Sequence, residues 1–120
     1  RDIPGIVADA HQGLKISDKE VGHIGHGSYL CYQRINLTDI RQIIAYVTSA
    51  GTGGEIQLRV GSRDGQLIGK VEVTPNGSWS EYVEQPIIIS PTSGRHDLYV
   101  CFDKPGVQSG MMNLASLSFR

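Results

Sequence analysis

The sequence predicts an all-β domain built as a two-sheet antiparallel β-sandwich. Apolar and polar residues alternate along most of the chain, as in strands with one buried and one solvated face. Turn-forming residues interrupt these runs about every 8–12 residues, which is typical of sandwiches and barrels. No segment keeps the 3.6-residue period of a helix. Leu37–Ile44 comes nearest, and we interpret it as a turn that leads into a strand.

The alternation is clearest in Glu55–Val60, where Ile56, Leu58 and Val60 share one face. Dipeptides such as Asp64-Gly65 and Asn76-Gly77, which adopt positive φ easily, separate the runs. Seven strands are predicted in this way: Ser28–Ile35, Arg41–Thr48, Glu55–Val60, Gln66–Val73, Glu81–Ile89, Arg95–Phe102 and Met111–Phe119.

The first 27 residues carry few strand signals. They contain Pro4, several glycines and scattered charges. A sandwich needs an opening strand in this region, and Ile6-Val7-Ala8 is the only segment that fits one.

The bulk properties indicate one folded domain over residues 1–120. This length suits a single core, and 39% hydrophobic with 19% charged residues indicates folding rather than disorder. The net charge of −1 argues against nucleic acid or an anionic membrane as partner. No apolar run approaches the roughly 20 residues of a membrane span. Because the chain begins at Arg1, without Met or a signal peptide, we expect a fragment of a larger multidomain protein.

The two cysteines, Cys31 and Cys101, both lie in apolar, strand-like runs. Two buried thiols are one interpretation, since free Cys is among the most buried residue types. A single bridge between neighbouring strands is the other, and the pattern leaves both open.

Catalytic and metal chemistry find little support. His23 and His26 have the spacing of a chelating pair, but a closed zinc site takes four ligands, usually including Cys. Hydrolysis of a sugar bond needs two carboxylates across a cleft. The best pair, Glu81 and Glu84, falls on opposite faces of a strand. No nucleophile elbow or phosphate loop is present, so we expect no enzyme active site in the chain.

Trp79 is the only tryptophan, and it follows the turn Pro75-Asn76-Gly77-Ser78. It either caps one end of the core or serves as a platform for a flat apolar ligand face. Sugars have such a face, and covering roughly 80 Å² of indole contributes about 2 kcal/mol at about 25 cal/mol per Å². With a few hydrogen bonds, this predicts a dissociation constant in the roughly micromolar to millimolar range.

Six segments carry a resemblance to a known family. They are Val21–Tyr29, Thr48–Val60, Gly65–Val71, Gly77–Tyr82, Gly94–Phe102 and Met112–Leu114. Taken in order and with their gaps, they span Val21 to Phe119 and resemble carbohydrate-binding module family 6. Gly77–Tyr82 looks like the glycine-tryptophan-x-x-aromatic turn of that family.

The resemblance implies a jelly-roll sandwich, galactose-binding-domain-like, with its main sugar site in loops at one end. In that family two aromatic side chains sandwich a sugar ring and an Asn hydrogen-bonds it. Trp79 matches the tryptophan and Asn113 the asparagine, whereas His23 stands where tyrosine is usual. We therefore expect weaker sugar binding than the family norm, or a different ligand. Tyr82 matches an aromatic that more often supports than contacts the sugar, and His26 is a further candidate contact.

The same resemblance implies that the chain could hold a structural calcium ion. The opening Glu-x-Glu strand of the family is reduced to Val7-Ala8-Asp9, and Ala115 replaces an acidic residue near the end. Asp9 is therefore a weak calcium candidate, because calcium takes six to eight oxygen ligands. No other cofactor is expected.

The function that the resemblance implies is non-catalytic binding of a polysaccharide or oligosaccharide, with no nucleic acid or membrane partner. Family 6 modules are usually appended to secreted glycan-degrading or sugar-oxidising enzymes, so a covalently linked catalytic domain and an extracellular or periplasmic location are expected. The alternative is a structural or protein-interaction sandwich with a decayed sugar site, which His23 favours. The exposure of Trp79 distinguishes the two.

Overall fold

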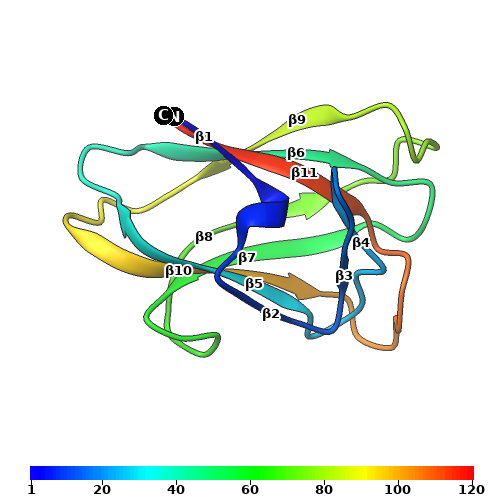
Figure 1. Cartoon of the computed structure of the whole chain (residues 1–120), viewed down its shortest axis with the longest axis horizontal. Helices are drawn as coiled ribbons and strands as arrows, with labels where there is room; N and C mark the ends of the chain where they lie inside the picture. Colours follow the sequence, from blue (N-terminus) through cyan, green and yellow to red (C-terminus); the bar gives the residue numbers. More distant parts are fainter.

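The alternating side chains divide between the inner and outer faces of two antiparallel sheets. A computed structural model describes residues 1–120, and the sheets pack face to face in it as a sandwich (Figure 1). One sheet has the strand order β3-β4-β11-β6-β9, with β1 also paired to β11, and the other β2-β5-β10-β7-β8. The strands are β1 (Asp2–Pro4), β2 (Ala10–Gln12), β3 (Lys15–Ile16), β4 (Val21–Gly22), β5 (Tyr29–Asn36), β6 (Gln42–Thr48), β7 (Gly54–Val60), β8 (Gln66–Val73), β9 (Val83–Ile88), β10 (Arg95–Asp103) and β11 (Asn113–Phe119).

The core lies between the two inner faces. In β7, Ile56 and Leu58 are fully buried, while Glu55, Gln57 and Arg59 between and beside them face outward and are half-buried. Each fully buried aliphatic side chain stabilises the fold by about 1.5–3 kcal/mol. In β7 the period-two alternation thus places one apolar face against the opposite sheet.

All seven predicted strands are present, and their ends differ from the prediction by no more than two residues. The largest differences are in β9, predicted as Glu81–Ile89, and in β11, predicted as Met111–Phe119. The interpretation of Leu37–Ile44 as a turn leading into a strand is also confirmed, since Thr38 and Asp39 form a turn and β6 follows.

The predicted opening strand at Ile6-Val7-Ala8 is wrong. Gly5–Val7 forms the 3₁₀ helix η1, and the strands of this region are β1 to β4. Each has only two or three residues, and β1 buries a single side chain, Ile3, which lies opposite Leu117 of β11. Such strands depend on backbone pairing with a distant partner, so no local alternation reveals them.

The cysteines are free thiols in neighbouring strands of the second sheet. Tyr99 lies opposite Cys31 and Tyr29 lies opposite Cys101, so the two thiols are offset along the strands and the bridge interpretation does not hold. Cys31 is buried, whereas Cys101 is only partly buried, on the outer face. Burial raises the pKa of Cys31, and it raises the pKa of Cys101 to about 11.

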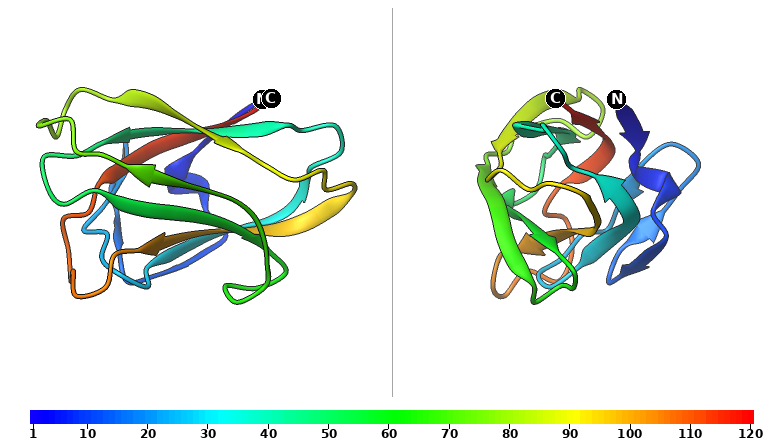
Figure 2. Two further views of the ribbon diagram at one scale, coloured as in Figure 1. Left: turned by 180° about the vertical axis from the view of Figure 1, so that it is seen from behind. Right: turned by 90° about the vertical axis from the view of Figure 1, so that its left-hand side faces the viewer.

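The chain termini lie side by side, away from the loops that follow β8 and β10 (Figures 1 and 2). The amino group of Arg1 donates a hydrogen bond to the carbonyl oxygen of Phe119 at 3.1 Å. The end of the sandwich formed by these loops is therefore free of the termini. The structure contains no helix of the length and apolarity that a membrane crossing requires.

Candidate functional site

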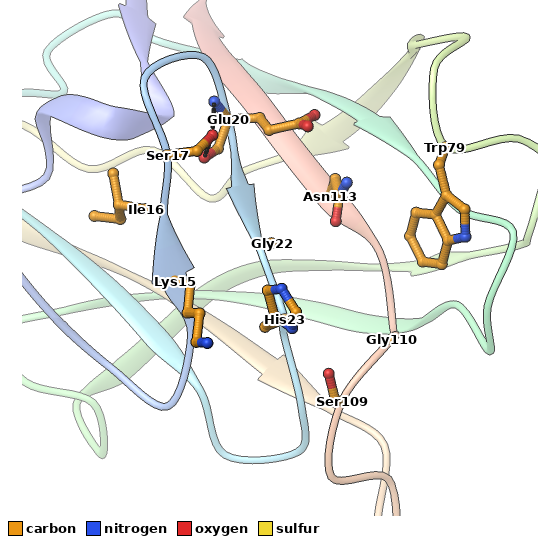
Figure 3. Close-up of a pocket in the computed structure, with 10 residues that line it drawn as sticks. All are labelled: Lys15, Ile16, Ser17, Glu20, Gly22, His23, Trp79, Ser109, Gly110 and Asn113. Atoms are coloured by element: carbon orange, nitrogen blue, oxygen red, sulfur yellow. Dashed lines mark hydrogen bonds between the residues drawn. The ribbon is translucent and has the colours of Figure 1, made fainter.

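A pocket of about 520 Å³ opens at the end of the sandwich that the termini leave free. Its walls come from the β3–β4 hairpin, the β8–β9 loop, the β10–β11 loop and the start of β11 (Figure 3). The residues that line it are Lys15, Ile16, Ser17, Glu20, Gly22, His23, Trp79, Ser109, Gly110 and Asn113. Trp79, His23 and Asn113, which the resemblance implies for one site, therefore line the same pocket.

Trp79 stands on the β8–β9 loop with 43% of its surface exposed. The hydroxyl of Thr48 donates to the carbonyl oxygen of Ser78 at 2.6 Å. The amides of Asn76 and Gly77 donate to the carbonyl oxygen of Ser49, each at 2.9 Å. The backbone before Trp79 is thus hydrogen-bonded to the last residue of β6 and to Ser49, which follows β6. These bonds hold the indole at the pocket without burying it in the core.

The floor beside the indole depends on a close approach between two loops. A Cβ on Gly51 would lie 1.8 Å from the carbonyl oxygen of Gly110 and 3.2 Å from the Trp79 ring. The amide of Thr52 donates to the same Gly110 oxygen at 3.0 Å. Only glycine fits at position 51, and its small size allows the indole and the β10–β11 loop to meet.

Asn113 begins β11 and pairs with Thr48 of β6. Its side-chain amide makes no hydrogen bond within the chain, although the residue is only partly exposed. An Asn amide offers two N–H donors and one acceptor oxygen, so this group is free to bind the hydroxyls of a ligand.

His23 follows β4 directly and has a φ of 53°. This left-handed conformation is uncommon for residues other than glycine, although His is enriched among the exceptions, and it costs about 1 kcal/mol or more. The next residue, Ile24, is fully buried, and its carbonyl oxygen accepts the amide of Met111 at 3.0 Å. The exposed ring of His23 and the indole of Trp79 lie on either side of the Asn113–Gly110 segment (Figure 3).

The β3–β4 hairpin supplies the wall that sequence reasoning missed. Its turn is closed by Ser17, whose amide donates to the carbonyl oxygen of Glu20 at 2.9 Å and whose hydroxyl accepts the Glu20 amide at 3.3 Å. The signal in the sequence is a polar four-residue turn between Lys15-Ile16 and Val21. The strands on either side of this turn are too short to be recognised as a hairpin. Ser109 was missed as well, since nothing in its loop singles it out.

Two of the candidate contacts lie outside this pocket. The ring of Tyr82 stacks on Tyr46, with centroids 6.4 Å apart and planes 6° from parallel, so it supports the sheet beside the site. His26 is tied to the end of β10, because its Nδ1 accepts the amide of Lys104 at 3.0 Å and lies 3.3 Å from the Asp103 carboxylate.

A second hollow, of about 270 Å³, adjoins His26 on the outer face of the other sheet. Its lining includes Tyr29, Arg59 and Cys101. The guanidinium of Arg63 lies 5.6 Å from the centroid of the Tyr29 ring, so this aromatic face is already covered by a cation.

The structure does not bring together the histidine pair or the carboxylate pair that zinc binding or catalysis would need. The Asp9 carboxylate accepts the Gln33 amide at 2.7 Å, and no three His, Cys, Asp or Glu side chains gather into a metal site, so Asp9 has no second carboxylate beside it. His23 and His26 line separate hollows and do not form the chelating pair. Glu20 is the one carboxylate of the main pocket, whereas sugar hydrolysis uses two.

Comparison with known proteins gives one consistent result. The profile of the family described as Carbohydrate binding module (family 6) matches residues 5–120. The chain is 27% identical over 93 residues to Endo-1,4-beta-xylanase A of Thermoclostridium stercorarium, and the match covers 78% of this chain and 18% of that enzyme. The chain therefore spans about a fifth of the length of that relative.

Solved structures agree. A family 6 module of Clostridium cellulolyticum in complex with xylose is 28% identical, with a TM-score of 0.92 over 100% of this chain and 96% of that one. A β-1,3-glucan-binding module of Bacillus halodurans is also 28% identical, with a TM-score of 0.90 over 100% and 95% of the two chains. With the match of the family profile to nearly the whole chain, these likenesses show that the protein belongs to carbohydrate-binding module family 6, whose modules are non-catalytic β-sandwiches that bind carbohydrate.

Proposed function

We propose that the chain binds a glycan by stacking one pyranose ring on Trp79, with His23 against the opposite face and the Asn113 amide hydrogen-bonded to ring hydroxyls. The observation that carries this proposal is an indole, 43% exposed, that lines the same pocket as an amide with no partner in the chain. An indole packed into the core would have favoured the alternative, a sandwich that serves only protein contacts.

The expected affinity is modest. Covering roughly 80 Å² of the indole contributes about 2 kcal/mol, and each net hydrogen bond adds about 0.5–1.5 kcal/mol. These contributions correspond to a dissociation constant in the roughly micromolar to millimolar range. The imidazole of His23 covers less of a sugar face than a phenol does, so the second stacking contact is the weaker one.

The relatives favour β-linked glycans as ligands and a catalytic domain as neighbour. The solved relatives include a complex with xylose and a β-1,3-glucan binder. The curated relative is a xylanase more than five times as long as the matched segment. We propose that this chain is likewise joined to a sugar-active enzyme and works outside the cytoplasm, where it docks that enzyme on polysaccharide. Weak binding suits this role, because tethering raises the local concentration of the enzyme at the polymer.

Affinity gel electrophoresis tests this proposal. The wild-type chain and Trp79→Ala are run through gels that contain xylan or β-1,3-glucan. Ile88→Ala is a matched control, since Ile88 is 72% exposed and lies outside the pocket. At least one polysaccharide should retard the wild type and the control but not Trp79→Ala, with little change in melting temperature. A wild-type chain that neither polysaccharide retards would contradict the proposal and support a decayed site.

A further inference from the structure

We propose that the pocket selects glycans that carry a uronic-acid unit next to the ring stacked on Trp79, and that Lys15 is the residue that determines this specificity. The inference rests on the proposed function, because it concerns the same pocket. It adds a class of ligand, acidic glycans, that neither the family nor the named relatives indicate.

The pocket extends across neighbouring strands rather than around a single ring. Asn113 of β11 adjoins Gly22 of β4, where a Cβ would lie 3.1 Å from the Asn113 side-chain oxygen. Gly22 in turn pairs directly with Lys15 of β3. Adjacent strands are about 4.8 Å apart, so Lys15 lies roughly 10 Å from the strand of Asn113. A ring stacked on Trp79 does not span this distance, and the neighbouring sugar unit of the chain reaches Lys15.

The charge of Lys15 is not used inside the protein. Its ammonium group forms no ion pair and no hydrogen bond, since the close contacts between basic and acidic side chains in the chain are His26 with Asp103 and Arg120 with Glu84. Figure 3 shows the ammonium group at the His23 end of the pocket. An ammonium group acts as a point charge toward an anion, and the pocket contains no arginine that would favour a bidentate ligand such as a phosphate. One lysine therefore matches one carboxylate.

Glu20 determines which sugar unit of the bound glycan can carry a carboxylate. Its side chain also lacks an ion-pair partner, and it extends toward Asn113 and away from Lys15 (Figure 3). A carboxylate on the ring stacked on Trp79 would lie near the like charge of Glu20, whereas one on the next unit would lie near Lys15. The two charges, on separate sides of the pocket, favour a neutral sugar on Trp79 followed by an acidic one.

The experiment compares one oligosaccharide in two forms. Glucuronic-acid-substituted xylo-oligosaccharides are measured by calorimetry beside the same sample after reduction of its carboxyl groups, which leaves the linkages unchanged. The wild type should bind the acidic form about threefold to fivefold more tightly at low salt, the range of an exposed ion pair, and the difference should vanish in about 0.5 M salt because of screening.

Lys15→Met should bind the two forms equally. Lys19→Met is the matched control, since Lys19 is an exposed lysine in the turn of the same hairpin but does not line the pocket, and it should keep the wild-type preference. Equal binding of both forms by the wild type, or loss of the preference in Lys19→Met as well, would overturn the role of Lys15.

The outcome separates this inference from the proposed function. Laminarin, a neutral β-1,3-glucan, is measured in the same series. If the wild type binds laminarin or the reduced oligosaccharide but does not prefer the acidic form, the inference fails and the proposed function stands. If the wild type binds none of the three ligands, both fail.

Discussion

Gly22 and Asn113 lie side by side on neighbouring strands, and the missing side chain of one leaves room for the amide of the other. A Cβ at Gly22 would lie 3.1 Å from the Asn113 Oδ1 atom. Gly22 has no positive φ, so its role is to leave space and not to adopt a conformation reserved for glycine. The orientation of the amide that we expect to bind sugar is therefore set by β4.

Gly22→Ala should weaken glycan binding without destabilising the fold. The new methyl group displaces the Asn113 amide by a few tenths of an ångström, and loss of its hydrogen bonds reduces affinity by about twofold to tenfold. Calorimetry with the retarding glycan measures this effect. The free energy of unfolding should change little, because the lower entropy of the unfolded chain with alanine offsets the cost of the close contact with Asn113. Unchanged affinity would mean that Asn113 is not a contact.

Gly51→Ala should destabilise the fold, because its Cβ would meet the backbone oxygen of Gly110 at 1.8 Å. Backbone cannot yield as a side chain does, so we expect a loss of about 3 kcal/mol in urea unfolding. Gly106→Ala is the control. It has a φ of 89° but nothing within 4 Å of its added Cβ, and it should lose only about 1 kcal/mol. Equal losses in the two variants would rule out steric contact at Gly51 as the cause.

His23→Tyr should tighten binding of neutral glycans. A phenol ring covers roughly 20–30 Å² more of a sugar face than an imidazole, which corresponds to about a threefold gain in affinity. His23→Ala, which removes the ring, should weaken binding instead. Calorimetry on the three proteins gives the order of affinities. An increase in affinity for His23→Ala would show that this ring obstructs the site.

The thiols should react slowly in the native protein. Burial raises the pKa of Cys31 and raises that of Cys101 to about 11, so little thiolate exists at pH 8. Titration with a disulfide reagent should find two thiols in denaturant without prior reduction and slow reaction under native conditions. A single free thiol or none in denaturant would indicate a bridge.

The raised pKa of Cys101 also predicts a loss of stability in alkali. The unfolded chain releases this proton near the ordinary value of 9.0, whereas the folded chain keeps it to about 11. The contribution is therefore present below pH 9 and decreases as the pH rises toward about 11. Thermal unfolding across this range should show a smaller decrease for Cys101→Ala than for the wild type.

The strands from Ser28 onward could be predicted because each is long enough to show its alternation. Glu55–Val60 buries three of six side chains on one face, and this pattern is visible without any knowledge of its partners. The strands before Ser28 have two or three residues and are defined by their partners, as with Lys15-Ile16 against Val21-Gly22. Local sequence does not contain that pairing.

The residues of the candidate site likewise divide into those that local sequence indicates and those that only the fold brings together. Trp79 and Asn113 could be named from the turn that precedes the indole and from the resemblance to a family. Lys15 and Glu20 could not, because a lysine and a glutamate in a weakly patterned segment resemble any solvated pair until the hairpin places them in the pocket. His26 was predicted as a contact because it lies in the same loop as His23. The left-handed conformation of His23 and the hydrogen bond from Lys104 instead place the His26 ring outside the pocket.

The fluorescence of the single tryptophan tests the stacking of a sugar on Trp79 most directly. Because the chain has no other indole, its emission and its quenching by acrylamide report on position 79 alone. Saturation with a glycan that calorimetry shows to bind should shift the emission to shorter wavelength and protect the indole from quenching, since a pyranose then covers the exposed 43% of the side chain in part. Glycan binding that leaves both the emission and the quenching of Trp79 unchanged would contradict the account.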